Sequence, residues 1–235
     1  KRGGLKLKLS LFKPTWSHLS EIAAGGLPSL FRQGLGAIAA VCFNQVARTY
    51  GDEALAAFSI VSRIMMFCAS AMVGYGQGFQ PVSSFNYGAG KYDRVKKAYW
   101  FTFGLSEILL VLIVIPVAIF ARPIIRIFRD NTEVIEYAVR PLLLQCATII
   151  LVPVSMVTEM GFQSTGQRGL ATLSSSLRSG ILFIPVLLIL AYFRGMAGIQ
   201  EAQPVAYVLS FFVFMVLSRV FLGQIDKKAG LRNED

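Results

Sequence analysis

The amino-acid sequence predicts an all-α integral membrane protein with six transmembrane helices. The chain has 235 residues, of which 54% are hydrophobic and 15% are charged, whereas about 25% of the residues of a soluble domain are charged. The apolar residues gather in long stretches, and the basic residues lie mainly between these stretches. A chain that alternates in this way is expected to cross a bilayer several times.

Six stretches are long enough to cross a hydrocarbon core of about 30 Å, which takes roughly 20 helical residues. They are placed near residues 26–48, 54–80, 98–120, 134–160, 170–192 and 204–222. Prolines lie within or at the ends of these spans, where helices can kink. Residues 1–25 mix Leu, Phe and Lys with Trp16, which fits either a helix lying in the membrane interface or an ordinary solvated linker. Residues 223–235 are expected to form a cytoplasmic tail.

The formal charge of +10 is compatible with a nucleic-acid partner or with a membrane, and its distribution favours the membrane. Most basic residues outside the spans fall on the side that also holds both ends of the chain. The positive-inside rule therefore predicts that both termini are cytoplasmic. The outer segment ARPIIRIFRD (121–130) is the exception, and we expect it to form a short helix on the outer surface.

Several classes of function are disfavoured by the sequence. The three cysteines, Cys42, Cys68 and Cys146, lie in apolar stretches without a CxxC pair, and His18 is the single histidine. This pattern indicates neither a disulfide framework nor a metal site. The common motifs of intramembrane and soluble hydrolases are absent, so we expect a protein that is not an enzyme and needs no cofactor apart from a coupling ion.

Two residues of opposite charge are placed near the middle of the membrane. Arg63 lies nine residues into the second span and Glu107 nine residues into the third, which is roughly 14 Å of helix in each case. Because a charge in lipid is costly and usually faces a partner or a cavity, we expect the two to pair or to face one cavity. A structural ion pair without a role in transport is the alternative.

Amides are unusually frequent in the spans. Gln77, Gln80 and Ser84 follow an i, i+3, i+7 pattern and should share one helix face. Gly74 and Gly78 form a small-xxx-small pattern that permits close helix contact. Amides of this kind either line a wet cavity or join helices by hydrogen bonds. The candidate cavity residues are Gln33, Arg63, Gln77, Gln80, Glu107, Gln145, Glu159 and Gln163.

A resemblance rests on several segments in a fixed order. They are GLPSLFRQGLG (26–36), LAAFSIVSRI (55–64), GQGFQPVSSFNYGAGKYDRVKKA (76–98), FQSTGQ, LRSGILFIP and GIQEAQP. Together they resemble the multidrug and toxic compound extrusion (MATE) family, and within it the bacterial MepA-like branch. The resemblance covers nearly the whole chain.

The resemblance implies a twelve-span transporter of two six-span lobes. This chain would be the second lobe, preceded by the interlobe loop, and it would need the first lobe as its partner. Such transporters export hydrophobic cationic or amphipathic drugs across the bacterial plasma membrane in exchange for Na⁺ or H⁺, by alternating access. A lipid-linked oligosaccharide flippase of the same superfamily is the alternative, and a purely structural membrane subunit is a further one.

This chain departs from the family in places that concern the coupling ion. Some relatives have an acidic residue in the middle of the first span of this lobe, whereas here Glu21 lies at its start. Relatives commonly read Gln-Pro-x-x-Asp at the last span, whereas Gln203 and Pro204 are followed here by Tyr207. Ser179 stands where the branch usually has Gln. Ion coupling is therefore open to either lobe.

Overall fold

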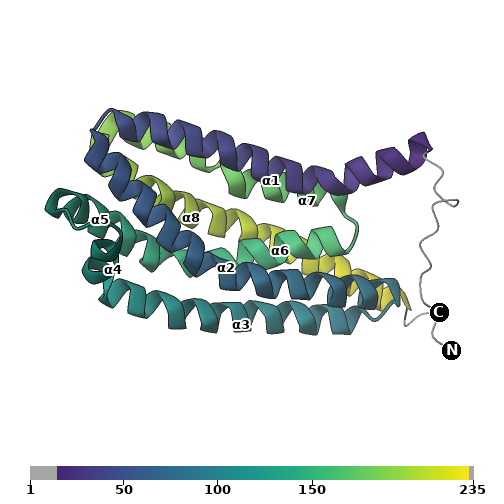
Figure 1. The fold of residues 1–235 in the computed structure, drawn as a ribbon. Helices are drawn as coiled ribbons and strands as arrows, with labels where there is room; N and C mark the ends of the chain where they lie inside the picture. The colour runs from purple at the N-terminus through teal and green to yellow at the C-terminus, as the bar shows by residue number, and fades with distance from the viewer. Residues whose placement is uncertain (1–14, 233–235) are drawn as a thin grey trace, which may run out of the picture.

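The computed structural model describes residues 15–232, and every regular element among them is a helix. The helices are α1 (Trp16–Arg48), α2 (Asp52–Gly88), α3 (Tyr92–Ile119), α4 (Ala121–Phe128), α5 (Thr132–Ile149), α6 (Val152–Ser164), α7 (Arg168–Ser176), the π-helical segment η2 (Leu177–Ile181) and α8 (Phe183–Arg232). They form one elongated bundle (Figure 1).

Each predicted span corresponds to one passage along the bundle. The first three spans are α1, α2 and α3, the fourth is α5 followed by α6, and the last two lie in α7, η2 and the two arms of α8. The start of α1, the α2–α3 turn, the α6–α7 turn and the end of α8 lie at one end of the bundle (Figure 1). Helix α4 and the α1–α2 turn lie at the opposite end, as the predicted six-span topology requires.

Length and composition agree with a membrane location. Three helices can cross a membrane on these criteria, namely Asp52–Gly88, Tyr92–Ile119 and the continuous stretch Arg168–Gly230, and two bent helix pairs raise the number to five. The outer surface carries many large apolar side chains, among them Phe101, Ile108 and Leu112 on α3. Contact with lipid explains an apolar exterior that would be unfavourable in water.

Two features of the backbone differ from a set of simple straight spans. The fourth span is bent by 55° between α5 and α6, and Pro153 stands in the first turn of α6, where its missing N–H costs no helical hydrogen bond. Pro81, in contrast, lies inside a continuous α2. The second span therefore does not end at residue 80, because α2 continues to Gly88.

The reversal within α8 depends on glycine. Gly195 adopts φ +57°, a conformation that other residues rarely take. At Gly198 an added Cβ would lie 1.9 Å from the carbonyl oxygen of Leu190, so the backbones of the two arms pass in direct contact. The arm up to the reversal packs beside α1, and the second arm returns beside α6.

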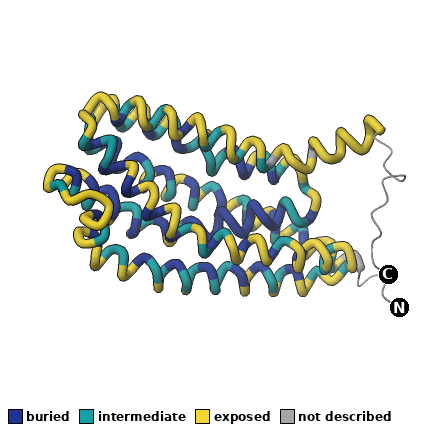
Figure 2. The backbone as a smooth tube through the Cα atoms, viewed as in Figure 1, coloured by how far each residue is buried: buried dark blue, intermediate teal, exposed yellow. Residues whose placement is uncertain are grey.

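Helix α6 occupies the centre of the lobe. Every residue from Val152 to Phe162 is buried (Figure 2), and α6 contacts α2, α3, α7 and α8. The closest approach to α2 is at Gly76, where a Cβ would lie 2.3 Å from side-chain atoms of Met156 and Met160. The predicted contact surface of Gly74 and Gly78 is wrong, since a Cβ at either position would meet nothing within 4 Å.

Candidate functional site

A polar cavity lies at the end of the bundle where α6 turns into α7. Its volume is about 570 Å³. Its lining comes from the start of α1, the second half of α2, the end of α6 and the start of α7, and comprises Gly25, Ser29, Gln80, Pro81, Ser84, Gln163, Ser164, Gly166, Arg168 and Ala171. We call it the amide cavity. It contains no carboxylate among these residues, and its polar groups are amides, hydroxyls and one guanidinium.

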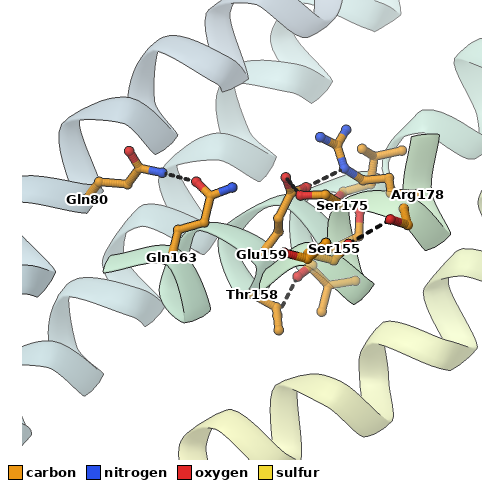
Figure 3. A network of polar contacts seen from close by, with 11 residues as sticks. Gln80, Ser155, Thr158, Glu159, Gln163, Ser175 and Arg178 are labelled. Atoms are coloured by element: carbon orange, nitrogen blue, oxygen red, sulfur yellow. Dashed lines mark hydrogen bonds and ion pairs between the residues drawn. The ribbon is translucent and has the colours of Figure 1, made fainter. Parts of the chain in front are cut away.

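Two glutamines join the helices that form the cavity. Gln80 Nε2 donates a hydrogen bond of 2.6 Å to Gln163 Oε1, which links α2 to α6 (Figure 3). A second bond lies three residues further along α2 and one residue further along α6, where Ser164 Oγ donates to Ser83 Oγ at 2.8 Å. Gln163 Nε2 is buried and finds no acceptor among the described residues. Because an unsatisfied buried donor is costly, this amide is poised to bond a group that enters the cavity.

A buried ion pair lies one helical turn from Gln163. Glu159 is 1% exposed; its Oε1 accepts from Ser175 Oγ at 2.8 Å and its Oε2 accepts from Arg178 Nε at 2.8 Å (Figure 3). Both carboxylate oxygens are thereby satisfied, which a charge in so buried a helix requires. Arg178 is 25% exposed, so the pair has one fully enclosed member and one that reaches the surface of the lobe.

The partner of Glu159 lies in an irregular part of its helix. Arg178 is the second residue of η2, the π-helical segment between α7 and α8. Segments of π-helix are rare and occur often at functional sites. Gly180, in the same segment, packs closely on α1, with a Cβ position 3.0 Å from Leu35 Cβ. The π-helical segment thus holds Arg178 where α1, α6 and α7 meet.

The amide cavity and the ion pair form one polar line along α6. Glu159 and Gln163 are spaced i, i+4 and therefore lie on the same face of the helix. In Figure 3 the Gln163 amide lies between Gln80 on one side and the Glu159 cluster on the other. Glu159 and Gln163 thus place the ion pair and the amide cavity next to each other along α6.

The structure brings together three of the eight candidate residues, namely Gln80, Glu159 and Gln163. Of the remaining amides, Gln77 is exposed on α2 and does not line the cavity. Gln33 is exposed on α1, and Gln145 is half-buried on α5. Neither of them lines the amide cavity.

The predicted pairing of Arg63 with Glu107 is wrong, because neither residue forms an ion pair within the described part of the chain. Arg63 is exposed and lies in a groove with Ile124 and Phe128 of α4, and Glu107 does not line that groove. Glu107 is half-buried on α3, and its Oε2 has no hydrogen-bond partner in the described chain. Equal distances along two helices therefore did not place these two side chains on facing sides.

Two residues of the site, Ser175 and Arg178, were not predicted. The available signal was the helical hairpin around Gly166, which turns with φ +73° and places antiparallel residues before and after it side by side. Glu159 and Arg178 flank that turn on consecutive spans, and their opposite charges could have suggested the contact.

Comparisons with known proteins fit this architecture. A profile of the MatE family matches residues 28–189. The multidrug export protein MepA of Staphylococcus aureus (strain bovine RF122 / ET3-1) is 25% identical over 215 residues, which cover 91% of this chain and 47% of the relative. MepA of Staphylococcus haemolyticus (strain JCSC1435) is 23% identical over 205 residues, with 87% and 45% covered. The chain spans about half the length of these relatives.

Solved structures share the fold over the same extent. An outward-facing multidrug resistance MATE family transporter of the MOP superfamily superposes with a TM-score of 0.85 at 21% identity, over 94% of this chain and 50% of that one. A MATE crystal structure in the bent conformation gives 0.86 at 21% identity, over 95% and 50%. At such identities the likeness establishes the fold, which is that of half of each solved chain.

Proposed function

The chain belongs to the MatE family, and from this premise we propose that it is the second lobe of a cation-coupled drug exporter. The proposal is supported by the half-length match to relatives named as multidrug export proteins. The substrates would be hydrophobic cationic or amphipathic drugs, and the coupling ion Na⁺ or H⁺. The host membrane would be a bacterial plasma membrane, with both ends of the chain cytoplasmic.

The observation that carries the proposal is the polar line from the amide cavity to Glu159. The cavity opens where the predicted cytoplasmic ends of four helices meet, so a drug would enter it from the cytoplasm. The amide oxygen of Gln80 can accept from a cationic group, and Gln163 Nε2 can donate to a polar group of the same ligand, without the full attraction of a carboxylate. A ligand held by such groups is released more readily when the lobes move, as alternating access requires.

Coupling would act through the Glu159–Arg178 pair. A proton on Glu159, or a cation beside it, competes with the guanidinium of Arg178 for the same oxygen. The coupling ion changes the conformational equilibrium only through its different affinity for the two states. A state in which Arg178 has moved away would bind the ion, whereas the state described here, in which the pair is closed, would not.

The test is drug efflux from cells that express the chain together with a first lobe. Efflux is expected to stop when an ionophore collapses the proton and sodium gradients. Efflux that continues after both gradients are gone would rule out antiport. A Glu159→Gln variant keeps the shape of the side chain but removes its charge. It should still bind drug, but its transport should no longer respond to pH or to sodium.

A further inference from the structure

A second groove lies at the opposite end of the bundle from the amide cavity. It has a volume of about 580 Å³ and is formed by α2, the end of α3 and the outer helix α4. Its lining comprises Arg63, Ile64, Met66, Phe67, Ser70, Val117, Ile124 and Phe128. We call it the outer groove. Apart from Arg63 and Ser70 the lining side chains are apolar, and Met66 and Phe67 are both more than two-thirds exposed.

The charge in the outer groove is at its outer end. Arg63 precedes Ser70 by seven residues of α2, which corresponds to about 10 Å along the helix. Since α2 starts at the end of the bundle that carries α4, Arg63 lies toward the outer surface and Ser70 toward the middle of the membrane. The groove therefore changes from cationic to apolar in the direction in which a phospholipid changes from headgroup to acyl chain.

Arg63 has no carboxylate partner within the described part of the chain. On α4, by contrast, Arg126 forms an ion pair with Asp130 at 3.0 Å, and this hydrogen bond and charge raise the pKa of Arg126. Asp130 is therefore paired with Arg126 and does not compensate the charge of Arg63. An exposed guanidinium without a carboxylate partner favours an anion, and its planar fork matches a phosphate in particular.

We propose that the outer groove binds an anionic phospholipid of the outer leaflet. The phosphate would lie on Arg63 at the end of the groove that holds Ile124 and Phe128 of α4, and an acyl chain would follow Met66 and Phe67 toward Ser70. A free anion would use only the charged end of the groove, and a neutral hydrocarbon only the apolar part. A phospholipid uses both.

The proposal gives a role to the outer segment that breaks the positive-inside rule. Arg122 and Arg129 lie on α4 and at its end, exposed, and form no ion pair within residues 15–232. Positive charge next to the groove attracts anionic headgroups and raises their local concentration. Lipid binding here is independent of the transport proposed above.

The experiment is native mass spectrometry of the purified protein after equal exposure to phosphatidylglycerol and phosphatidylcholine. The wild type should retain phosphatidylglycerol in preference. Arg63→Gln should lower that retention about fivefold, and Phe67→Ala should lower the retention of both lipids. Arg48→Gln removes an exposed arginine at the end of α1, outside the groove, and should change neither. Equal loss from Arg63→Gln and Arg48→Gln, or no preference in the wild type, would overturn the proposal.

A second measurement locates the lipid and separates it from a protein occupant. A nitroxide is attached to the cysteine of a Ser70→Cys variant. Its EPR lines should broaden when the added phosphatidylglycerol carries a second spin label on its acyl chain. The broadening should be much smaller when Arg63→Gln is present in the same chain. If Ser70→Cys is instead protected from lipid-borne labels and cross-links to protein, then a second polypeptide fills the groove and the lipid proposal is wrong.

Discussion

At the scale of single residues, the most consequential contact is that of Glu159 with its two donors. Each carboxylate oxygen has one partner, Ser175 or Arg178, inside a helix with no exposed residue between Val152 and Phe162. Removing one member of a buried ion pair costs about 3–5 kcal/mol, because the other charge is left without compensation. The two members are not equivalent here, because only Arg178 reaches the surface.

This asymmetry predicts an order of stability. Arg178→Met leaves the buried Glu159 charge without its cationic partner and should lower the free energy of unfolding the most. Glu159→Gln leaves Arg178, which already reaches the surface of the lobe, and should cost less. The double variant should recover part of the loss from Arg178→Met. Thermal unfolding in detergent measures all three, and a Glu159→Gln protein that is less stable than Arg178→Met would contradict the prediction.

A second prediction concerns the amides of α2. Gln80→Leu removes the hydrogen bond to Gln163 and places an apolar group in the amide cavity, so it should change which drugs are exported. Gln77→Leu is the matched control, because Gln77 is exposed on the same helix and does not line the cavity. Resistance profiles against a panel of cationic drugs compare the two. Unaltered selectivity in Gln80→Leu would mean that this bond serves only helix packing.

At this scale the sequence predicted the kinds of residue better than their contacts. The amide-rich end of α2 was expected to line a wet cavity, and Gln80 and Ser84 do so while Gln77 does not. Side chains at i, i+3 and i+7 are spread over about 60° around the helix axis. A cavity on one side of the helix can therefore contact some of them and not the others. The predicted pairing of Arg63 with Glu107 was wrong for a related reason. Counting residues gives the distance along a helix but neither the tilt nor the rotation of that helix.

At the scale of the elements, glycine decides how closely α2 approaches the central helix. A Cβ at Gly76 would lie 2.3 Å from side-chain atoms of Met156 and Met160, and both of these side chains are buried. Gly78 lies two residues further along α2 and is exposed, and a Cβ there would meet nothing within 4 Å. The two glycines differ in packing while sharing a helix, a neighbourhood and a backbone conformation.

Gly76→Val should therefore destabilise the lobe, and Gly78→Val should not. Overpacking in a close-packed interior costs about 1–3 kcal/mol, whereas the change in helix propensity is common to both variants. The difference between their unfolding free energies, measured by denaturant titration in mixed micelles, isolates the contact with α6. Equal stabilities would mean that Met156 and Met160 can move aside.

The boundaries of the elements could be predicted from the sequence only in part. Positions of the spans follow from apolar length, which the helices confirm. The bend at the middle of the fourth span and the continuity of α2 through Pro81 do not follow from it. A proline removes one N–H in either case, and its effect depends on whether neighbouring helices compensate the freed carbonyl. That is a property of packing, which one sequence does not display.

At the scale of the whole molecule, orientation in the membrane fixes the meaning of both grooves. The basic cluster Lys91, Arg94, Lys96 and Lys97 lies at the α2–α3 turn, the same end as the amide cavity, and α4 lies at the other end. With the cluster in the cytoplasm, drugs enter the amide cavity from inside and the outer groove meets the outer leaflet. The reverse orientation would exchange these roles, so the two proposals share this premise.

Cysteine labelling tests the premise directly. In a background where Cys42, Cys68 and Cys146 are replaced by alanine, Arg94→Cys should react with a membrane-impermeant maleimide only after the cells are opened. Arg129→Cys, exposed at the end of α4, should react in intact cells. The positive-inside rule gives this direction because basic segments are retained on the cytoplasmic side during insertion. Labelling of Arg94→Cys in intact cells, with Arg129→Cys protected, would reverse the topology. The amide cavity would then open to the outside, where it could not admit a drug from the cytoplasm.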